Sequence, residues 1–497
     1  MKLPTYTVLR GKELEDFLKA GIEIKKDEVI SHLTEYDGHD LFPKWLMFIR
    51  CIEEFINIRY VISADEWMAF EKCSIDIREN KRDLMGILKI VQCRFGNDVL
   101  ERIKSIIIML LGLRLTYQKM RLPGMECKTI ADAVNFIQSR RLYYVAYLTL
   151  IRLYAKGSKK AQFIELLCHF QSQVDFNIMP ITTAFHSIIG NRCIDGYEAR
   201  ANNWGVEFCM HYNQLENFFL EPLTMSEIDI IEYEHKNIST TNIPKNLYSY
   251  AELLYTVKQA ETLFKGYGID ESLVLQEIRQ MVLDLDGQFI DGYSICMTED
   301  IFKDFCMKYP HLRLFSEAQD YYEAINERPA FFQNESNYYS TVLLIIRYVE
   351  NTIYGLLRKN RRYRIKAGFL FEKRVKALLE KYGYECTNVK RIHKQEFDVL
   401  CRQGDCIYNF QCKNNYLDIN NLTIANIDKV CGQNKRLVKY YQNALDKENF
   451  RTKWVIEKFG VEKVENYVVA RFPIVMNHKR LIAFNKLEEW LKGEKKE

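Results

Sequence analysis

Two alternating runs of apolar and polar residues, separated by a short polar turn, constrain the fold of this chain most strongly. The first run is 395–400 and the second is 407–413, and both are rich in β-branched and aromatic side chains. Between them lies the sequence RQGD at 402–405, in which the glycine can adopt a positive φ. The pattern predicts a β-hairpin.

The predicted hairpin has a defined polar face, because successive side chains of a strand point to opposite sides. Asp398 is expected to share its face with Glu396, and Gln411 is expected to share its face with Lys413. If the strands pair around the turn, a carboxylate, an amide oxygen and an amine converge on one spot. The alternative is an ordinary surface hairpin whose charged side chains are solvated.

The order Asp398, then Gln411-X-Lys413, resembles the PD-(D/E)XK nuclease superfamily, in the variant where glutamine replaces the second acid. The segment before it is predicted to be a helix that opens at Gly368 and ends near Tyr384. That segment, with its Gly…Phe-Glu pattern, looks like the first helix of the Mrr-type restriction endonucleases. The matching glutamate is Glu372, which the resemblance places near a metal ion.

The resemblance implies a Mg²⁺-dependent nuclease, with Mn²⁺ as the alternative ion, and four catalytic residues: Glu372, Asp398, Gln411 and Lys413. Asp398, the amide oxygen of Gln411 and the backbone carbonyl of Cys412 would bind the metal, since Mg²⁺ prefers hard oxygen ligands. Lys413 would orient the attacking water. DNA is the expected substrate. The expected biological setting is defence against foreign or viral DNA, as in restriction. RNA is the weaker alternative because no RNA-recognition sheet motif is visible.

Charge is distributed unevenly along the chain. From residue 358 onward there are 31 Lys and Arg against 17 Asp and Glu, a net charge of +14, which leaves −10 for the first 357 residues. A basic segment favours a polyanionic partner. The expected nucleic-acid contacts lie in the basic stretch and on the helix after the hairpin: Arg358, Lys359, Arg361, Arg362, Arg364, Gln433, Lys435 and Arg436.

The fold class expected from the sequence is a mainly α N-terminal region followed by a C-terminal α/β domain like that of the restriction endonucleases, a mixed sheet flanked by helices. Apolar residues recur at three- and four-residue spacing through the first 340 residues and predict an all-α assembly. The helices expected there are at 12–20, 46–58, 81–91, 99–115 and 130–154.

Three segments are predicted along the chain. Residues 1–340 form the helical region, of no recognised family, with a subdomain boundary at the polar stretch 235–245. Residues 341–366 form an apolar-to-basic connecting helix, and 367–497 form the nuclease-like domain. After the hairpin, that domain is expected to contain a helix at 426–444, strands at 467–472 and 480–484, and a closing helix at 486–491.

Other features bound the setting of the protein. No apolar run approaches the roughly 20 residues of a membrane-spanning helix, and the amino terminus lacks the apolar core of a secretory signal. The fourteen cysteines show no Cys-x-x-Cys pair, which predicts reduced thiols in a cytoplasmic protein. From the lack of a long apolar run, no membrane partner is expected. The helical region is expected to mediate dimerisation or higher oligomerisation. A second class of function stays open: a catalytically inactive nucleic-acid-binding or scaffold protein with a nuclease-like fold.

Overall fold

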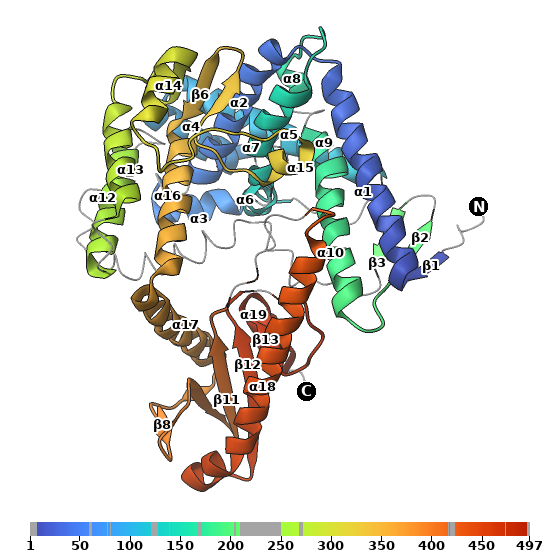
Figure 1. Cartoon of the computed structure of the whole chain (residues 1–497), viewed down its shortest axis with the longest axis vertical. Helices are drawn as coiled ribbons and strands as arrows, with labels where there is room; N and C mark the ends of the chain where they lie inside the picture. Colours follow the sequence, from blue (N-terminus) through green and yellow to red (C-terminus); the bar gives the residue numbers. More distant parts are fainter. Residues whose placement is uncertain are drawn as a thin grey trace. The chain divides into compact units, whose positions relative to one another are not determined.

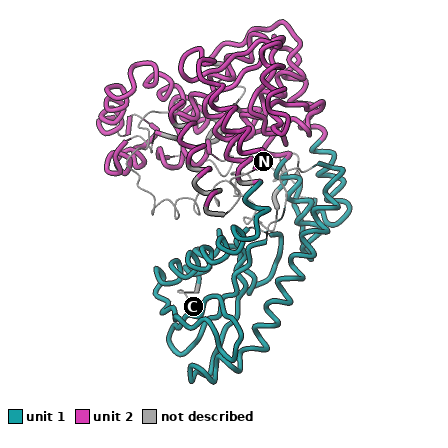
Figure 2. Tube along the Cα trace, turned by 60° about the vertical axis from the view of Figure 1, so that its left-hand side comes forward, with its two compact units in different colours: residues 1–22, 182–233, 356–497 teal, residues 23–181, 234–355 magenta. Residues whose placement is uncertain are grey.

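A computed structural model describes residues 7–58, 62–76, 78–79, 81–120, 128–138, 140–166, 171–202, 205–208, 250–267, 272–415, 417, 423–472 and 474–494. The chain divides into two compact units (Figure 2). The first unit combines 1–22, 182–233 and 356–497, and the second combines 23–181 and 234–355. The division therefore does not follow the predicted boundary at residue 340. The predicted linker at 235–245 lies outside the described residues.

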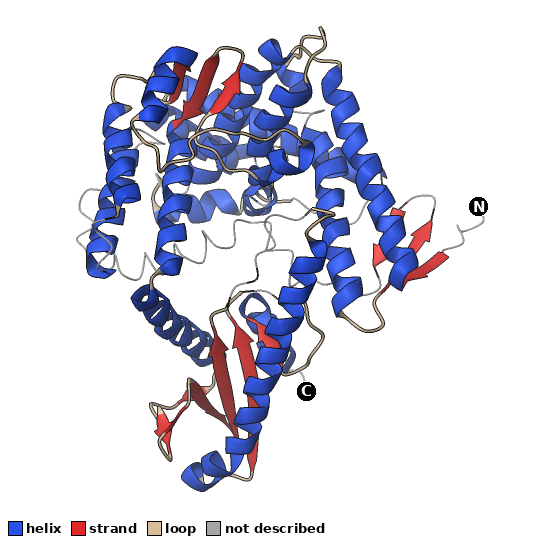
Figure 3. Cartoon of the chain, in the orientation of Figure 1, coloured by secondary structure: helices blue, strands red, loops and turns tan. Residues whose placement is uncertain are grey.

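The second unit is built mainly from helices, as the sequence periodicity predicted (Figures 1 and 3). Its core is aromatic: the buried Trp45 packs against Phe48 and Tyr147 and donates a hydrogen bond to the carbonyl of Tyr144. The helices that lie in this unit or enter it are α1 (Gly11–Thr34), α2 (Gly38–Asn57), α3 (Ala64–Glu71), α4 (Lys81–Phe95), α5 (Asn97–Met120), α6 (Ile130–Gln138), α7 (Arg141–Tyr154), α8 (Phe163–Glu165), α9 (Gln171–Gln173), η3 (Val174–Ile178), α10 (Met179–Cys193), α12 (Tyr250–Tyr267), α13 (Leu273–Asp284), α14 (Glu299–Met307), α15 (Tyr321–Asn326) and α16 (Val342–Lys359).

The all-α prediction for the first 340 residues is wrong in two places, where small antiparallel sheets occur. One sheet has the order β1-β2-β3 and the other has the order β4-β6-β5. Their strands are only three to five residues long, too short for a period of two to stand out from the surrounding helical pattern. The strands are β1 (Thr7–Arg10), β2 (Glu198–Asn202), β3 (Gly205–Phe208), β4 (Ser294–Thr298), β5 (Phe332–Asn334) and β6 (Asn337–Thr341).

The predicted connecting helix at 341–366 is also wrong, because two helices meet at Asn360. The side chain of Asn360 accepts a hydrogen bond from the backbone N–H of Tyr363 at 3.0 Å and so caps a new helix, α17 (Arg361–Lys381). The basic stretch therefore forms the first turns of α17, which begins at Arg361 and not at Gly368. Likewise, the predicted helix at 130–154 is two helices, α6 and α7.

The C-terminal part of the first unit contains a mixed sheet with the order β13-β12-β11-β10-β7 among the described residues. The predicted hairpin is confirmed: β10 pairs antiparallel with β11, and Val399 lies opposite Phe410. Strands β11, β12 and β13 are parallel to one another. The strands are β7 (Glu385–Cys386), β10 (Val399–Gln403), β11 (Cys406–Lys413), β12 (Lys463–Ala470) and β13 (Leu481–Ala483), and a separate two-stranded finger consists of β8 (Arg391–Ile392) and β9 (Gln395–Glu396).

Helices cover both faces of this sheet. On one face, α17 and α19 (Phe484–Glu494) bury Val375, Leu379 and Leu487 against Val399 and Phe410. On the other face, α18 (Ile427–Phe459) buries Val455 in a cluster that also contains Leu400 and the finger residue Phe397. Successive side chains of β10 point to opposite faces of the sheet, so this strand contributes to the apolar cores on both faces.

Helix α18 is much longer than the predicted 426–444, since it continues for 33 residues to Gly460, which has a positive φ of 63° and ends the helix. A mainly α protein with a C-terminal α/β domain is therefore confirmed. No described helix combines the length and the apolar character that crossing a bilayer requires.

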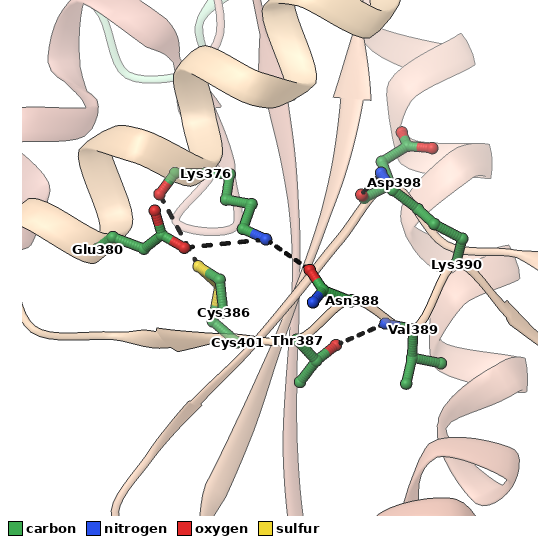
Figure 4. The surroundings of a disulfide bond; sticks show 9 residues. All are labelled: Lys376, Glu380, Cys386, Thr387, Asn388, Val389, Lys390, Asp398 and Cys401. Carbon is green, nitrogen blue, oxygen red and sulfur yellow. Dashed lines mark hydrogen bonds and ion pairs between the residues drawn. A yellow bond between two sulfur atoms is a disulfide. The ribbon is translucent and has the colours of Figure 1, made fainter.

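One pair of cysteines departs from the predicted reduced thiols. Cys386 and Cys401 are disulfide-bonded across the β7–β10 pair, where their Cα atoms are direct partners (Figure 4). Their separation of 15 residues carries no sequence signal. The disulfide depends on the pairing of β7 with β10, which brings Cys386 opposite Cys401. The sequence pattern of the β10–β11 hairpin does not predict that pairing.

Candidate active site

The candidate site is centred on Asp398, which lies in the bend between β9 and β10. Its carboxylate oxygen Oδ2 accepts hydrogen bonds from the side-chain amide of Gln411 and from the backbone N–H of Cys412, the latter at 2.7 Å. The hairpin register explains the contact, because Val399 opposite Phe410 places Asp398 opposite Gln411. The predicted convergence of the carboxylate and the amide is therefore confirmed.

Glu372 is carried by α17 and is linked to Asp398 by Lys390, a residue that the sequence analysis did not identify. Lys390 Nζ lies 3.0 Å from the carboxylate of Glu372 and 2.8 Å from the backbone oxygen of Asp398. Figure 4 shows Lys390 extending along the strand connection toward Asp398. The only sequence signal for Lys390 is its position eight residues before the acid, in a basic pair.

Burial dominates the electrostatics of Asp398. The pKa of this carboxyl is raised from 3.8 to about 6, mainly by desolvation and to a lesser extent by the negative charge of Glu372. The N–H of Cys412 and the charge of Lys413 act in the opposite direction but do not cancel the burial. The protein therefore holds a carboxylate at neutral pH in surroundings that disfavour its charge.

The raised pKa of Asp398 predicts how the stability of the protein depends on pH. Because the folded state binds the Asp398 proton more tightly than the unfolded state, stability falls as the pH rises from about 4 to about 6. A shift from 3.8 to about 6 corresponds to about 3 kcal/mol of unfolding free energy. We expect Asp398→Asn to be more stable than the wild type by up to about this amount at pH 7, and by little at pH 4. Urea unfolding at the two pH values measures the difference, and an equal effect at both would contradict it.

Lys413 ends β11, on the same face as Gln411, as predicted. Its ammonium lies 5.7 Å from the ring centroid of Tyr440 on α18, within the range of a cation–π contact. Its backbone carbonyl accepts a hydrogen bond from the N–H of Arg471 at 2.8 Å, which fixes the end of the strand. Gln433 lies seven residues before Tyr440 and so on the same face of α18.

Glu396, considered as part of the polar face, points elsewhere. Its side chain is 72% exposed and pairs with Arg391 within the β8–β9 finger. The alternation that placed it beside Asp398 fails because the chain bends between β9 and β10. Glu396 is therefore excluded from the candidate site.

The basic residues predicted to contact nucleic acid lie in two groups. Arg361, Arg362 and Arg364 are exposed in the first turns of α17, directly after Arg358 and Lys359 at the end of α16. Lys435 and Arg436 are exposed on α18. Arg361, Arg362 and Arg364 are therefore carried by α17, the helix that also carries Glu372.

A buried polar network lies under the site, between the sheet and α18. The carboxylate of Glu448 accepts hydrogen bonds from Asn409 at 3.0 Å and from Arg451 at 2.9 Å. Arg451 also donates to the side chain of Gln395 at 2.6 Å and to the backbone oxygen of Glu396 at 3.3 Å. The network therefore ties α18 to the strand that enters Asp398, and sequence reasoning missed it.

The donor atoms around Asp398 are of the type that binds a hard divalent cation. The carboxylates of Asp398 and Glu372, an amide and a backbone carbonyl are oxygen donors of the kind that Mg²⁺ prefers, and the charge of Glu372 lies close enough to Asp398 to raise the pKa of its carboxyl. Rotation of the Gln411 side chain about its last bond exchanges the amide nitrogen for the oxygen beside Asp398. Within the described residues, however, no group of three His, Cys, Asp or Glu side chains could hold a metal ion. Any ion would therefore depend on Gln411, a backbone oxygen and water.

No protein-family model, curated protein or solved structure matches this chain. The geometry around Asp398 is therefore the basis on which a function can be assigned.

Proposed function

We propose that this protein is a metal-dependent nuclease with a restriction-endonuclease-like C-terminal domain, acting as an endonuclease on DNA. The observation that carries the proposal is the partly buried carboxylate of Asp398, held by Gln411 and Cys412 with Glu372 and Lys413 nearby. A chain gains no stability from keeping an acid in a place that raises its pKa to about 6. Such a cost is typical of a functional site.

Each residue has a role that its position allows. Asp398 would bind the metal, and Gln411 and the N–H of Cys412 hold its carboxylate in one orientation. Lys413 would orient the attacking water and stabilise the negative charge that develops on the phosphate. Glu372 would add a second carboxylate, and Lys390 keeps that carboxylate beside Asp398.

Mg²⁺ or Mn²⁺, when bound by Asp398, Gln411 and the carbonyl of Cys412, would neutralise phosphoryl charge and lower the pKa of a bound water. Gln411 is neutral, so this donor set carries one negative charge fewer than a site with two acids. We therefore expect weak metal binding, in the millimolar range, relative to a site in which a second acid stands at this position.

DNA is the preferred substrate because of the charge of the segment that contains the site. The net charge is +14 from residue 358 onward, and exposed arginines lie on the same helix as Glu372. Phosphate contacts by such side chains position a duplex without reading its sequence. A role in defence against foreign DNA follows from the likeness to the Mrr-type enzymes.

The deciding experiment is incubation of the purified protein with plasmid, linear DNA, single-stranded DNA and RNA, with Mg²⁺, Mn²⁺ or chelator. Metal-dependent nicking or linearisation of plasmid is expected, with no activity in chelator. Binding of DNA without cleavage under every metal condition would favour the alternative, a catalytically inactive nucleic-acid-binding protein. Cleavage of RNA alone would reassign the substrate.

The arginines at the start of α17 make a prediction about salt dependence. Each phosphate contact contributes about 0.9 to the slope of log affinity against log salt, because binding releases condensed counterions. Replacing Arg361, Arg362 and Arg364 with alanine is expected to flatten the slope by up to about three. Fluorescence anisotropy with one duplex, titrated in chelator at several salt concentrations, measures the slope.

A matched control removes the same charge elsewhere on the domain. Lys447, Lys453 and Lys458 are exposed on the C-terminal half of α18. Replacing these three lysines with alanine should leave the slope nearly unchanged. If both triple variants lower the slope equally, the first turns of α17 are not the specific contact surface.

A further inference from the structure

Two cysteines far apart in the sequence meet where α10 contacts α18, away from Asp398. The side chains of Cys193, at the end of α10, and Cys431, in the first turns of α18, interact directly. The contact is reinforced one turn away, where Arg192 pairs with both Glu15 of α1 and Asp428 of α18. The ends of the two helices that carry the thiols are therefore also joined by the ion pairs of Arg192.

The two thiols differ in their surroundings. Cys193 is partly exposed and lines a cavity of about 510 Å³, together with Lys435, Lys439 and His478. Cys431 is buried, with 5% of its surface exposed. A reagent in the cavity can therefore reach Cys193, whereas Cys431 is shielded from solvent.

The pKa values of the two thiols are shifted in opposite directions. The hydrogen bond from Cys431 lowers the pKa of the Cys193 thiol to about 7, helped by the Asn434 side chain and the charge of Lys435 and opposed by burial. The same contact raises the pKa of Cys431, which keeps its proton. At pH 7 about half of the accessible sulfur is thus thiolate, whereas the buried sulfur is the thiol.

We propose that Cys193 and Cys431 form a redox-active dithiol in which Cys193 reacts with a peroxide and Cys431 resolves the product as a disulfide. In the first step the Cys193 thiolate attacks H₂O₂: an S–O bond forms, the O–O bond breaks and hydroxide leaves, giving a sulfenic acid. In the second step the Cys431 sulfur attacks the Cys193 sulfur. The S–O bond breaks, and the hydroxyl leaves with the Cys431 proton as water. The two cysteines are oxidised by two electrons and the peroxide is reduced.

In this pair an accessible sulfur contacts a second cysteine sulfur. Cys93 is exposed on α4. Cys93 is therefore the internal reference for an ordinary accessible thiol. The proposed disulfide would join the end of α10 to the start of α18, both within the first unit.

The full-length protein tests the proposal in three measurements. At pH 7, alkylation of Cys193 followed by mass spectrometry should be about tenfold faster than alkylation of Cys93, because the thiolate fraction is larger. Stoichiometric H₂O₂ should give a Cys193–Cys431 cross-linked peptide on non-reducing mapping. In Cys431→Ser the sulfenic acid has no resolving thiol, so dimedone should label Cys193.

Two outcomes would overturn the proposal. One is a wild-type map without the Cys193–Cys431 peptide after peroxide, which does not depend on any variant folding. The other is dimedone labelling of Cys431 in Cys193→Ser at the rate seen for Cys193 in Cys431→Ser, because the roles of the two thiols would then be equivalent. The Cys386–Cys401 peptide serves as the mapping control, since that disulfide exists before treatment.

Discussion

The Asp398→Asn variant is expected to cleave DNA at least about 10³-fold more slowly than the wild-type protein. The substitution keeps the shape of the side chain and an acceptor for the N–H of Cys412, but it removes the charge that would bind the metal. Loss of one charge-stabilising group in an active site typically costs about 10²- to 10³-fold in rate, and loss of a metal ligand is at the upper end. Plasmid nicking at saturating Mg²⁺ gives the rate.

The control for this variant is Asp405→Asn, which changes the same residue type in the exposed turn of the same hairpin. Its rate should match that of the wild type. DNA binding in chelator should be unchanged in both variants, because neither removes a positive charge. An Asp398→Asn protein that retains more than a tenth of the wild-type rate would exclude Asp398 as the metal ligand and would leave the site assignment wrong.

The same substitution is expected to stabilise the fold at neutral pH, so activity and stability should change in opposite directions. This coupling distinguishes a functional acid from a structural one. A structural carboxylate is held by cations and its loss destabilises the protein, whereas the carboxyl of Asp398 has a pKa raised to about 6 by its burial. Asn at position 398 would therefore remove the free-energy cost of holding a charged carboxylate there, a cost that a bound cation would offset in the wild type.

The hairpin could be predicted from the sequence because period-two alternation and a glycine turn are local signals. The facing of Asp398 and Gln411 followed from that hairpin. The predicted helix start at Gly368 is wrong, because the helix is capped by Asn360, eight residues earlier, in a stretch whose neighbours are charged. Helix propensity and capping decided the boundary there, not the family-like motif.

Other parts of the site depend on contacts that no local pattern encodes. Lys390 reaches Glu372 only because α17 packs on the sheet beside the segment that leads to Asp398. Glu448 looks like a solvated residue of a charged helix, yet it is buried because α18 lies across β11 at Asn409. The Cys193–Cys431 pair likewise joins residues 238 positions apart. Tertiary packing sets each of these contacts, so periodicity and spacing could not reveal them.

The buried pair of Glu448 and Arg451 is expected to give the largest stability effect in the C-terminal domain. Their side chains are only 2% and 7% exposed, and their closest atoms are 2.9 Å apart. Removing one partner leaves an uncompensated buried charge, which typically costs about 3–5 kcal/mol. Arg451→Met, which keeps most of the side-chain volume, should therefore lower the unfolding free energy by about that amount in urea titrations. The pair of Lys486 and Glu489, whose side chains are 25% and 73% exposed, is the control, since Lys486→Met should cost no more than about 1 kcal/mol.

A second substitution separates the lost charge pairing from lost packing. In the Arg451→Met background, Glu448→Gln removes the unpaired charge and leaves the amide oxygen to accept from Asn409. The double variant should therefore regain at least about 1 kcal/mol relative to Arg451→Met, a coupling that additive effects cannot produce. Because Arg451 also holds Gln395 and the backbone of Glu396, two residues before Asp398, neither variant should recover full cleavage. Recovery of stability together with wild-type cleavage would show that the network supports the fold alone and does not position Asp398.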